Sequence, residues 1–110
     1  MLKMDLEYEK KILFIRLNGS LTKKESYKIN NYIIPVIKKH NLKKVILNLE
    51  KLKAIDTSGI YAILNTKCTI RNNKGNIYLC GVSKDIELKL KHLHIITKSS
   101  EKEIIKLIEV

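Results

Sequence analysis

The sequence predicts an α/β fold with a mixed, mostly parallel sheet of four to five strands and about four helices. Residues 4–9 alternate apolar and polar side chains, the period of two that is typical of half-buried strands. After residue 44, apolar runs alternate with segments in which apolar residues recur at helical spacing, as in parallel strands joined by crossover helices. The expected order is ββαβαβα(β)α. At 110 residues the chain has the size of a single domain, spanning residues 1–110.

The first two strands are expected to form a hairpin at one edge of the sheet. In the first strand, Met4, Leu6 and Tyr8 lie on one side and acidic residues on the other. Residues 9–11 are a tight connection, and residues 12–17 form the second strand.

A helix is predicted to begin at Thr22, because Glu25 follows at the spacing of a capping box. Pro35 lacks an N–H and would clash with the carbonyl one turn earlier, so a kink or an early end is expected there. Asn41 is the expected stop. The residues at helical spacing are Tyr27, Asn30, Ile33, Ile34 and Ile37.

The central strand is predicted at residues 45–49. It is apolar except for Asn48, which favours a strand covered on both faces. A second helix follows Ser58, and residues 77–82 form the next strand. The expected buried face of this helix consists of Ile60, Ile63, Leu64 and Cys68.

The last part of the chain is predicted to hold two helices and one short strand. Ser83 is expected to cap the first of these helices, and residues 93–97 to form the strand. Ser100 and Glu103 have the spacing of a capping box before the final helix.

The composition is that of a globular protein expected in the cytoplasm. The chain is 45% hydrophobic and 30% charged, and no apolar run approaches the roughly 20 residues of a membrane helix. Its first residues lack the apolar stretch of a signal peptide. Cys68 and Cys80 form no metal or disulfide pattern, so both are expected to pack in the core.

The formal net charge of +11 raises the question of an anionic partner. Apart from Arg16 and Arg71, the 22 basic residues are lysines, spread along the chain without the aromatic interleaving that nucleic-acid binding uses. We therefore expect a solvated basic surface, with no direct nucleic-acid partner and no membrane partner.

The motifs of several enzyme classes are missing, and no catalytic residue, metal or cofactor is predicted. The glycines are isolated and no GxxxxGK[ST] phosphate loop is present. His92 and His94 have no third metal ligand nearby in sequence, and His40 suits the C-terminal end of a helix. Ser58 lacks the GxSxG context of a hydrolytic nucleophile. The chain is not expected to be an enzyme.

The strand-to-helix junction at residues 56–59 holds the most distinctive chemistry. By itself, the sequence Asp56-Thr57-Ser58-Gly59 favours a simple helix start, with Asp56 as N-cap and Gly59 allowing close packing. The alternative is that a hydroxyl there accepts a phosphate, which would meet free backbone N–H groups and the positive end of the helix dipole.

The junction and its flanks resemble the STAS domain of bacterial anti-sigma factor antagonists. The resemblance rests on Leu47-Asn48-Leu49-Glu50, on Ile55-Asp56-Thr57-Ser58-Gly59-Ile60 followed by a helix, and on Ile77-Tyr78-Leu79-Cys80-Gly81-Val82. The similarity in element order extends over essentially the whole chain. It implies a STAS-like single domain in which Ser58, or as second choice Thr57, is phosphorylated.

The resemblance also implies partners. Antagonists of this family bind, when unphosphorylated, an anti-sigma factor that is also a serine kinase, and thereby release a sigma factor. Phosphorylation ends the binding and a phosphatase restores it. The implied docking residues are Asp56, Thr57, Ser58, Gly59 and Ile60. This chain departs from many such antagonists in being basic, and a basic antagonist suits an acidic kinase.

A second function remains open at this point. The domain could be a STAS adaptor subunit of a larger transport or signalling complex, without a phosphorylation switch. Stable association with a transporter or scaffold, and no phosphate on Ser58, would distinguish it.

Overall fold

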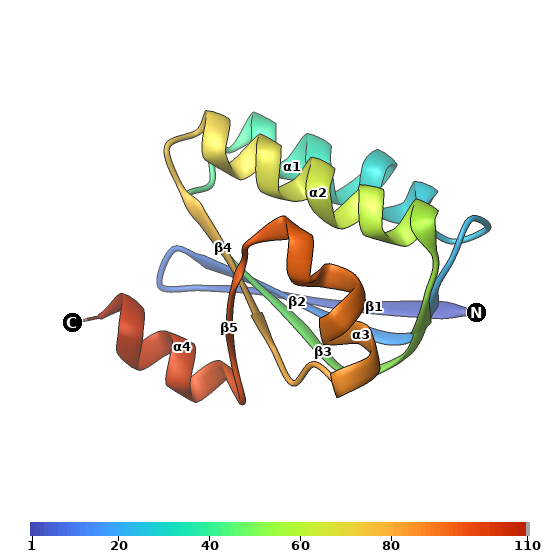
Figure 1. The fold of residues 1–110 in the computed structure, drawn as a ribbon. Coiled ribbons are helices and arrows are strands. Elements are labelled where there is room, and N and C mark those ends of the chain that lie inside the picture. The colour runs from blue at the N-terminus through green and yellow to red at the C-terminus, as the bar shows by residue number, and fades with distance from the viewer. Residues whose placement is uncertain (110) are drawn as a thin grey trace.

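Five strands form one sheet in the order β1-β2-β3-β4-β5 (Figure 1). The computed structural model describes residues 1–109. β1 pairs antiparallel with β2, and the remaining neighbours are parallel, which confirms the mixed, mostly parallel sheet. The strands are β1 (Leu2–Glu9), β2 (Ile12–Leu21), β3 (Lys44–Ile55), β4 (Asn76–Cys80) and β5 (Ile96–Lys98).

Helices cover both faces of this sheet. They are the π-helical segment η1 (Ile29–Ile33), α1 (Ile34–Lys39), α2 (Thr57–Asn72), α3 (Lys84–Leu90), the 3-10 turn η2 (Lys91–Leu93) and α4 (Glu101–Ile108). Apolar residues of α1, α2 and α3 join one core cluster with the strands, and Ile104 of α4 lies in a second cluster on the opposite face. Val45 and Ile46 belong to different clusters and are both 0% exposed, so β3 is covered on both faces as predicted.

The outer strand β1 is less covered than its alternation suggested. Met4 is half-buried, but Leu6 and Tyr8 on the same side are 46% and 57% exposed. β1 is an edge strand, and an open groove lined by Tyr8, Val36 and His40 separates its end from α1. The hairpin itself is confirmed, with Glu9 paired to Ile12.

The first helix begins later than predicted and does not end at Pro35. Residues 23–26 are turns, and the carboxylate of Glu25 pairs with Lys28 at 2.8 Å. The N–H of Ile34 donates to the carbonyl of Ile29, the wide spacing of a π-helix, and Pro35 then lies in the first turn of α1. The missing N–H of Pro35 thus falls where the helix changes type, and the helix continues to Lys39.

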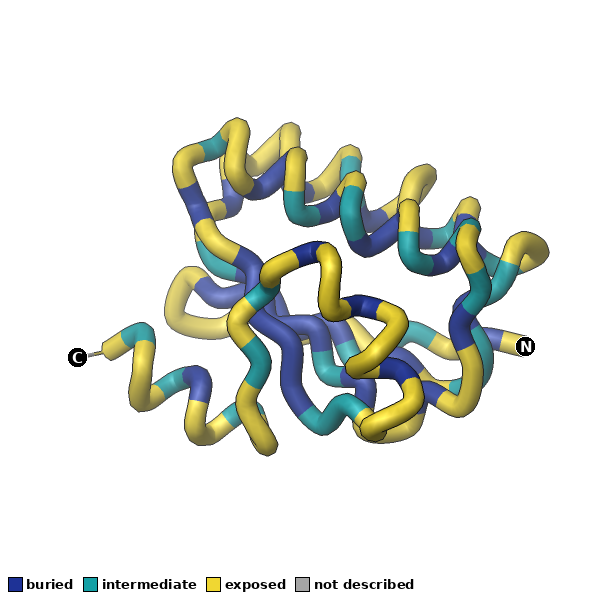
Figure 2. Tube along the Cα trace, in the orientation of Figure 1, coloured by how far each residue is buried: buried dark blue, intermediate teal, exposed yellow. Residues whose placement is uncertain are grey.

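The buried face of α2 differs from the predicted one. Ile63 is buried, but Cys68 is exposed and Ile60 and Leu64 are only partly covered. Thr66 and Thr69 are buried instead, and their hydroxyls donate to helix carbonyls of Ala62 and Asn65, each at 2.8 Å. This bonding removes the cost of burying a hydroxyl. Figure 2 shows the buried residues of α1 and α2 on the sides that face the sheet.

The segment before β5 was partly mispredicted. Residues 91–93 form a 3-10 turn, and His94 has a left-handed backbone with φ 53°, so neither His92 nor His94 lies on a strand. The strand begins only at Ile96. The predicted caps are confirmed, since the hydroxyls of Ser83 and Ser100 accept from the N–H groups of Ile86 and Glu103. Cys80 is buried, as predicted.

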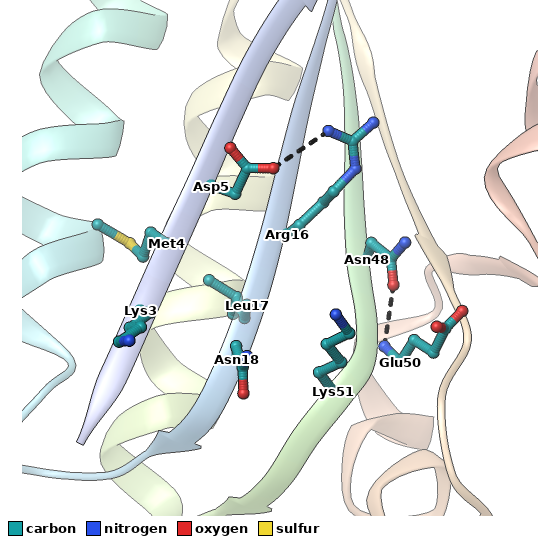
Figure 3. A pocket seen from close by; sticks show the side chains of 9 residues that line it. All are labelled: Lys3, Met4, Asp5, Arg16, Leu17, Asn18, Asn48, Glu50 and Lys51. Atoms are coloured by element: carbon teal, nitrogen blue, oxygen red, sulfur yellow. Dashed lines mark hydrogen bonds and ion pairs between the residues drawn. The ribbon is translucent and has the colours of Figure 1, made fainter.

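Arg16 ties α4 to the sheet. Its guanidinium donates to both carboxylate oxygens of Glu101, at 2.7 and 2.9 Å, and to Glu7 at 2.8 Å. Asn48 donates to the same Glu101 carboxylate at 2.8 Å and accepts the N–H of Glu50 at 2.9 Å. Arg16, Asn48 and Glu50 are among the residues that line an open hollow, shown in Figure 3. Asn48, the polar residue within the apolar central strand, therefore forms a hydrogen bond with a residue 53 positions away in sequence.

Gly59 lets the start of α2 approach the ends of β2 and β3. A Cβ at this position would lie 2.2 Å from the carbonyl oxygen of Leu21 and 2.7 Å from Cγ1 of Ile55. The backbone oxygen cannot move without disturbing the strand. Gly59 is therefore required for close approach, in agreement with the packing role predicted for it.

We expect Glu101→Gln to lower the free energy of unfolding by about 1 to 3 kcal/mol at neutral pH, because it removes the charged acceptor of Arg16. The hydrogen bond from Arg16 holds the pKa of the Glu101 carboxyl below its ordinary value. The stabilisation is thus fully present above the unfolded pKa of about 4.3 and is lost as the pH falls through the folded pKa. Urea unfolding between about pH 7 and about pH 3 measures both effects.

Glu103→Gln is the matched control, since Glu103 is an exposed carboxylate in the same first turn. It should leave stability and its acid dependence nearly unchanged. Equal effects of the two substitutions would contradict the role given to Glu101.

We expect Gly59→Ala to destabilise the fold by about 1 to 3 kcal/mol, because the added methyl group overlaps the Leu21 carbonyl. Cys68→Ala, at an exposed position of the same helix, should change stability little. Urea unfolding followed by circular dichroism compares the two, and an unchanged midpoint for Gly59→Ala would show that the junction can relax.

Candidate functional site

The junction site comprises residues 56–60, between β3 and α2. Asp56 has an extended backbone, φ −113° and ψ −175°, and its Oδ1 accepts the N–H of Gly59 at 3.0 Å. This is the N-cap that the sequence predicted. The chain turns from strand to helix at Thr57, so the next side chains stand in the first helical turn at the carboxyl end of β3.

The second carboxylate oxygen of Asp56 reaches a different part of the chain. Oδ2 accepts the N–H of Lys23 at 2.9 Å, and the Asp56 N–H donates to the carbonyl of Leu21 at 3.3 Å. Hydrogen bonds from Gly59 and then from Lys23 lower the pKa of Asp56, so the carboxylate is ionised at neutral pH. The loop after β2 and the first turn of α2 are thus held together by one side chain.

The two hydroxyl groups of the site differ in exposure. Thr57 is exposed, Ser58 is partly exposed, and Ile60 is partly covered, whereas Gly59 is buried. The first N–H groups of a helix have no intrahelical partner, so the hydroxyls stand at the positive end of α2. The structure therefore brings all five predicted docking residues into one turn, with both possible acceptors open to solvent.

Sequence reasoning missed two neighbours of this site. Lys89 of α3 directs Nζ to the carbonyl of Ile55 at 3.5 Å, which places a cation beside the end of β3. Tyr61 is 59% exposed and lies three residues after Ser58 and four after Thr57, on the same side of the helix. A large exposed aromatic at that spacing was visible in the sequence, whereas the contact of Lys89 depends on the fold.

Other chemistry finds little support at this site. Within residues 1–109, no group of three His, Cys, Asp or Glu side chains is arranged to hold a metal ion. His40 follows the C-terminal end of α1, at the opposite end of the sheet from Ser58. None of the helices described is both long and apolar enough to cross a membrane.

Comparisons with known proteins agree with this fold. The matching family model is the STAS domain, over residues 3–106. The anti-sigma F factor antagonist of Paenibacillus polymyxa is 25% identical over 85 residues, which cover 77% of this chain and 73% of that protein. The anti-sigma factor antagonist SpoIIAA in its unphosphorylated form has a TM-score of 0.82 at 23% identity, covering 97% of this chain and 98% of that chain.

The Bacillus cell fate determinant SpoIIAA has also been solved in its phosphorylated form. That structure matches with a TM-score of 0.77 at 20% identity, covering 96% of this chain and 99% of that chain. The family model matches nearly all of the sequence, from residue 3 to residue 106, and the chain belongs to the STAS domain family.

Proposed function

We propose that this chain is an anti-sigma factor antagonist that works by partner switching. In the unphosphorylated form it binds an anti-sigma factor with serine-kinase activity and so releases a sigma factor in the cytoplasm. Phosphorylation at Ser58 ends the binding, and a phosphatase restores it. The observation that carries this proposal is the geometry of the junction site. Both carboxylate oxygens of Asp56 accept backbone N–H groups, and Gly59 packs closely against the ends of β2 and β3. The hydroxyls of Thr57 and Ser58 therefore stand at the start of α2.

Ser58 is the proposed acceptor and Thr57 the second choice. Both stand in the first turn of α2, so a phosphate on either would meet free N–H groups and the positive end of the helix. Lys23 and Lys89 lie close to this end of the sheet and add positive charge. The fold should therefore tolerate the modification, which adds a charge of roughly −1.5 to −2.

The effect of the phosphate would be felt by the partner. The added charge would lie within a contact surface formed by Thr57, Ser58, Ile60 and Tyr61, which share exposed or partly exposed positions at the start of α2. Like-charge contacts at an interface cost several kcal/mol, enough to lower affinity by orders of magnitude. The chain supplies no ATP-binding loop, so the kinase partner provides nucleotide and magnesium, and the antagonist is a substrate and not an enzyme.

Ser58→Asp should weaken binding to the kinase partner by tenfold to about a thousandfold. Ser58→Ala should bind like the parent and should not be phosphorylated, because the acceptor hydroxyl is gone. Affinity capture identifies the partner, calorimetry measures binding, and mass spectrometry locates the phosphate. Thr57→Val tests the second-choice acceptor, and Ser58 should still be phosphorylated in this variant.

Unchanged binding of both Ser58 variants, together with no phosphate at residues 57 and 58, would contradict the switch. Stable co-purification with a transporter or scaffold in that case would favour the adaptor function.

Tyr61→Ala should weaken partner binding by about thirtyfold or more, since exposed tyrosines at the centre of an interface often dominate its affinity. Tyr8→Ala is the control, because Tyr8 has nearly the same exposure, 57% against 59%, but lies at the other end of the sheet. Calorimetry with the same partner compares them. Equal losses would show that Tyr61 is not part of the docking surface.

A further inference from the structure

The end of the molecule opposite the junction site gathers three pairs of lysines. They lie at the tip of the β1–β2 hairpin, in the last turn of α1, and around the start of β3. Figure 1 places the hairpin tip and the C-terminal ends of α1 and α2 on one side, away from the start of α2. The basic pole is Lys10, Lys11, Lys38, Lys39, Lys43 and Lys44.

Several contacts fix these segments next to one another. Leu13 of β2 pairs with Val45 of β3, so the hairpin tip lies beside the start of β3. Lys11, Lys43 and Lys44 line one open groove of about 370 Å³ together with Tyr8 and His40. The end of α2 is joined to the end of α1, because the Asn73 amide donates to the carbonyls of Ile37 and Leu42 at 3.1 and 2.9 Å. The three pairs therefore belong to one rigid end of the fold.

The lysines of this end form no ion pair with another described residue. In the described part, residues 1–109, the ion pairs are made by Arg16 and Lys28, and no lysine of the basic pole takes part in one. Glu9 is the sole acid in residues 9–11, 38–44 and 71–76. The negative end of the α1 dipole stabilises Lys38 and Lys39, which lie in the last turn of this helix. The lysines of the hairpin and of β3 are not in the last turn of a helix.

The chemistry of the pole favours a lipid surface over a nucleic acid. Its cations are lysines, which act as point charges and cannot form the bidentate contacts by which arginine reads bases and phosphates. Tyr8, 57% exposed, lines the groove of these lysines, and Val36, 39% exposed, lines a neighbouring groove that shares Tyr8 and His40. Lysine clusters beside an exposed tyrosine are typical of surfaces that meet anionic bilayers. In place of the solvated surface without a membrane partner that the sequence led us to expect, we propose that the basic pole binds anionic lipid headgroups at a membrane surface.

Attachment through the pole would leave the junction site accessible. β2 and β3 run from the pole to Asp56, so the two sites lie at opposite ends of the sheet, in a molecule about 33 Å in its longest dimension. A protein partner could then dock at the start of α2 while the pole faces lipid. This inference stands independently of the proposed partner switching, because it uses none of the residues of the junction site.

The test is sedimentation of the full chain with vesicles of phosphatidylglycerol and phosphatidylcholine, at about 0.1 M salt, where exposed charges are screened beyond about 10 Å. Pure phosphatidylcholine vesicles should bind much more weakly. Each lysine near an anionic surface contributes about fivefold in affinity, so Lys10→Gln, Lys11→Gln, Lys43→Gln and Lys44→Gln together should lower binding by about a hundredfold or more. Lys10→Gln with Lys11→Gln alone should lower it by about twentyfold.

The matched control replaces four exposed lysines near the junction end, Lys23, Lys24, Lys51 and Lys53, by glutamine. It changes the net charge equally, and its affinity for the vesicles should fall less than tenfold. Equal losses in the two fourfold variants, or equal binding to neutral vesicles, would overturn the proposal. Duplex DNA and polyglutamate are tested at the same salt concentration. If either binds more tightly than the vesicles and depends on the same lysines, the proposal is overturned. The pole would then be assigned to a nucleic acid or to an acidic protein.

Discussion

The carboxylate of Asp56 makes the contacts on which the geometry of the junction site depends. Its two oxygens accept the N–H groups of Gly59 and Lys23, which belong to the first turn of α2 and to the loop after β2. Gly59 permits this arrangement, because any side chain at that position would overlap the carbonyl of Leu21. The hydroxyls of Thr57 and Ser58 are consequently presented by a rigid frame, as a surface read by a partner requires.

The opposite face of the sheet depends on a second polar contact, of a different kind. Arg16 and Asn48 extend from adjacent strands toward Glu101, and they fix α4 over the apolar cluster that contains Ile104. Asp5 and Glu7 of β1 accept hydrogen bonds from the same guanidinium. The carboxylates on this face therefore form hydrogen bonds within the fold. The lysines of the basic pole, in contrast, remain available to solvent or to a partner.

Sequence patterns were most reliable where structure depends on near neighbours. The hairpin of β1 and β2, the serine caps of α3 and α4 and the cap by Asp56 were all predicted, because each rests on residues within a few positions of one another. The capping box at Thr22 did not form, because the N–H of Glu25 donates to the backbone carbonyl of Thr22 at 2.9 Å and the Glu25 carboxylate pairs with Lys28. The buried face of α2 was misread because Thr66 satisfies its hydroxyl within the helix and can be buried.

The sequence by itself determined the order of the elements, the crossover connections and the position of the junction, since hydrophobic period and capping residues specify these locally. It also carried the family resemblance that gives Ser58 its expected role. Only the tertiary structure decided that Tyr61 and Lys89 lie beside the junction site, that Asn48 bonds to α4, and that lysines dispersed along the chain meet at one end. These features depend on strand pairing and helix packing between distant segments, and no local pattern encodes which surfaces such packing brings together.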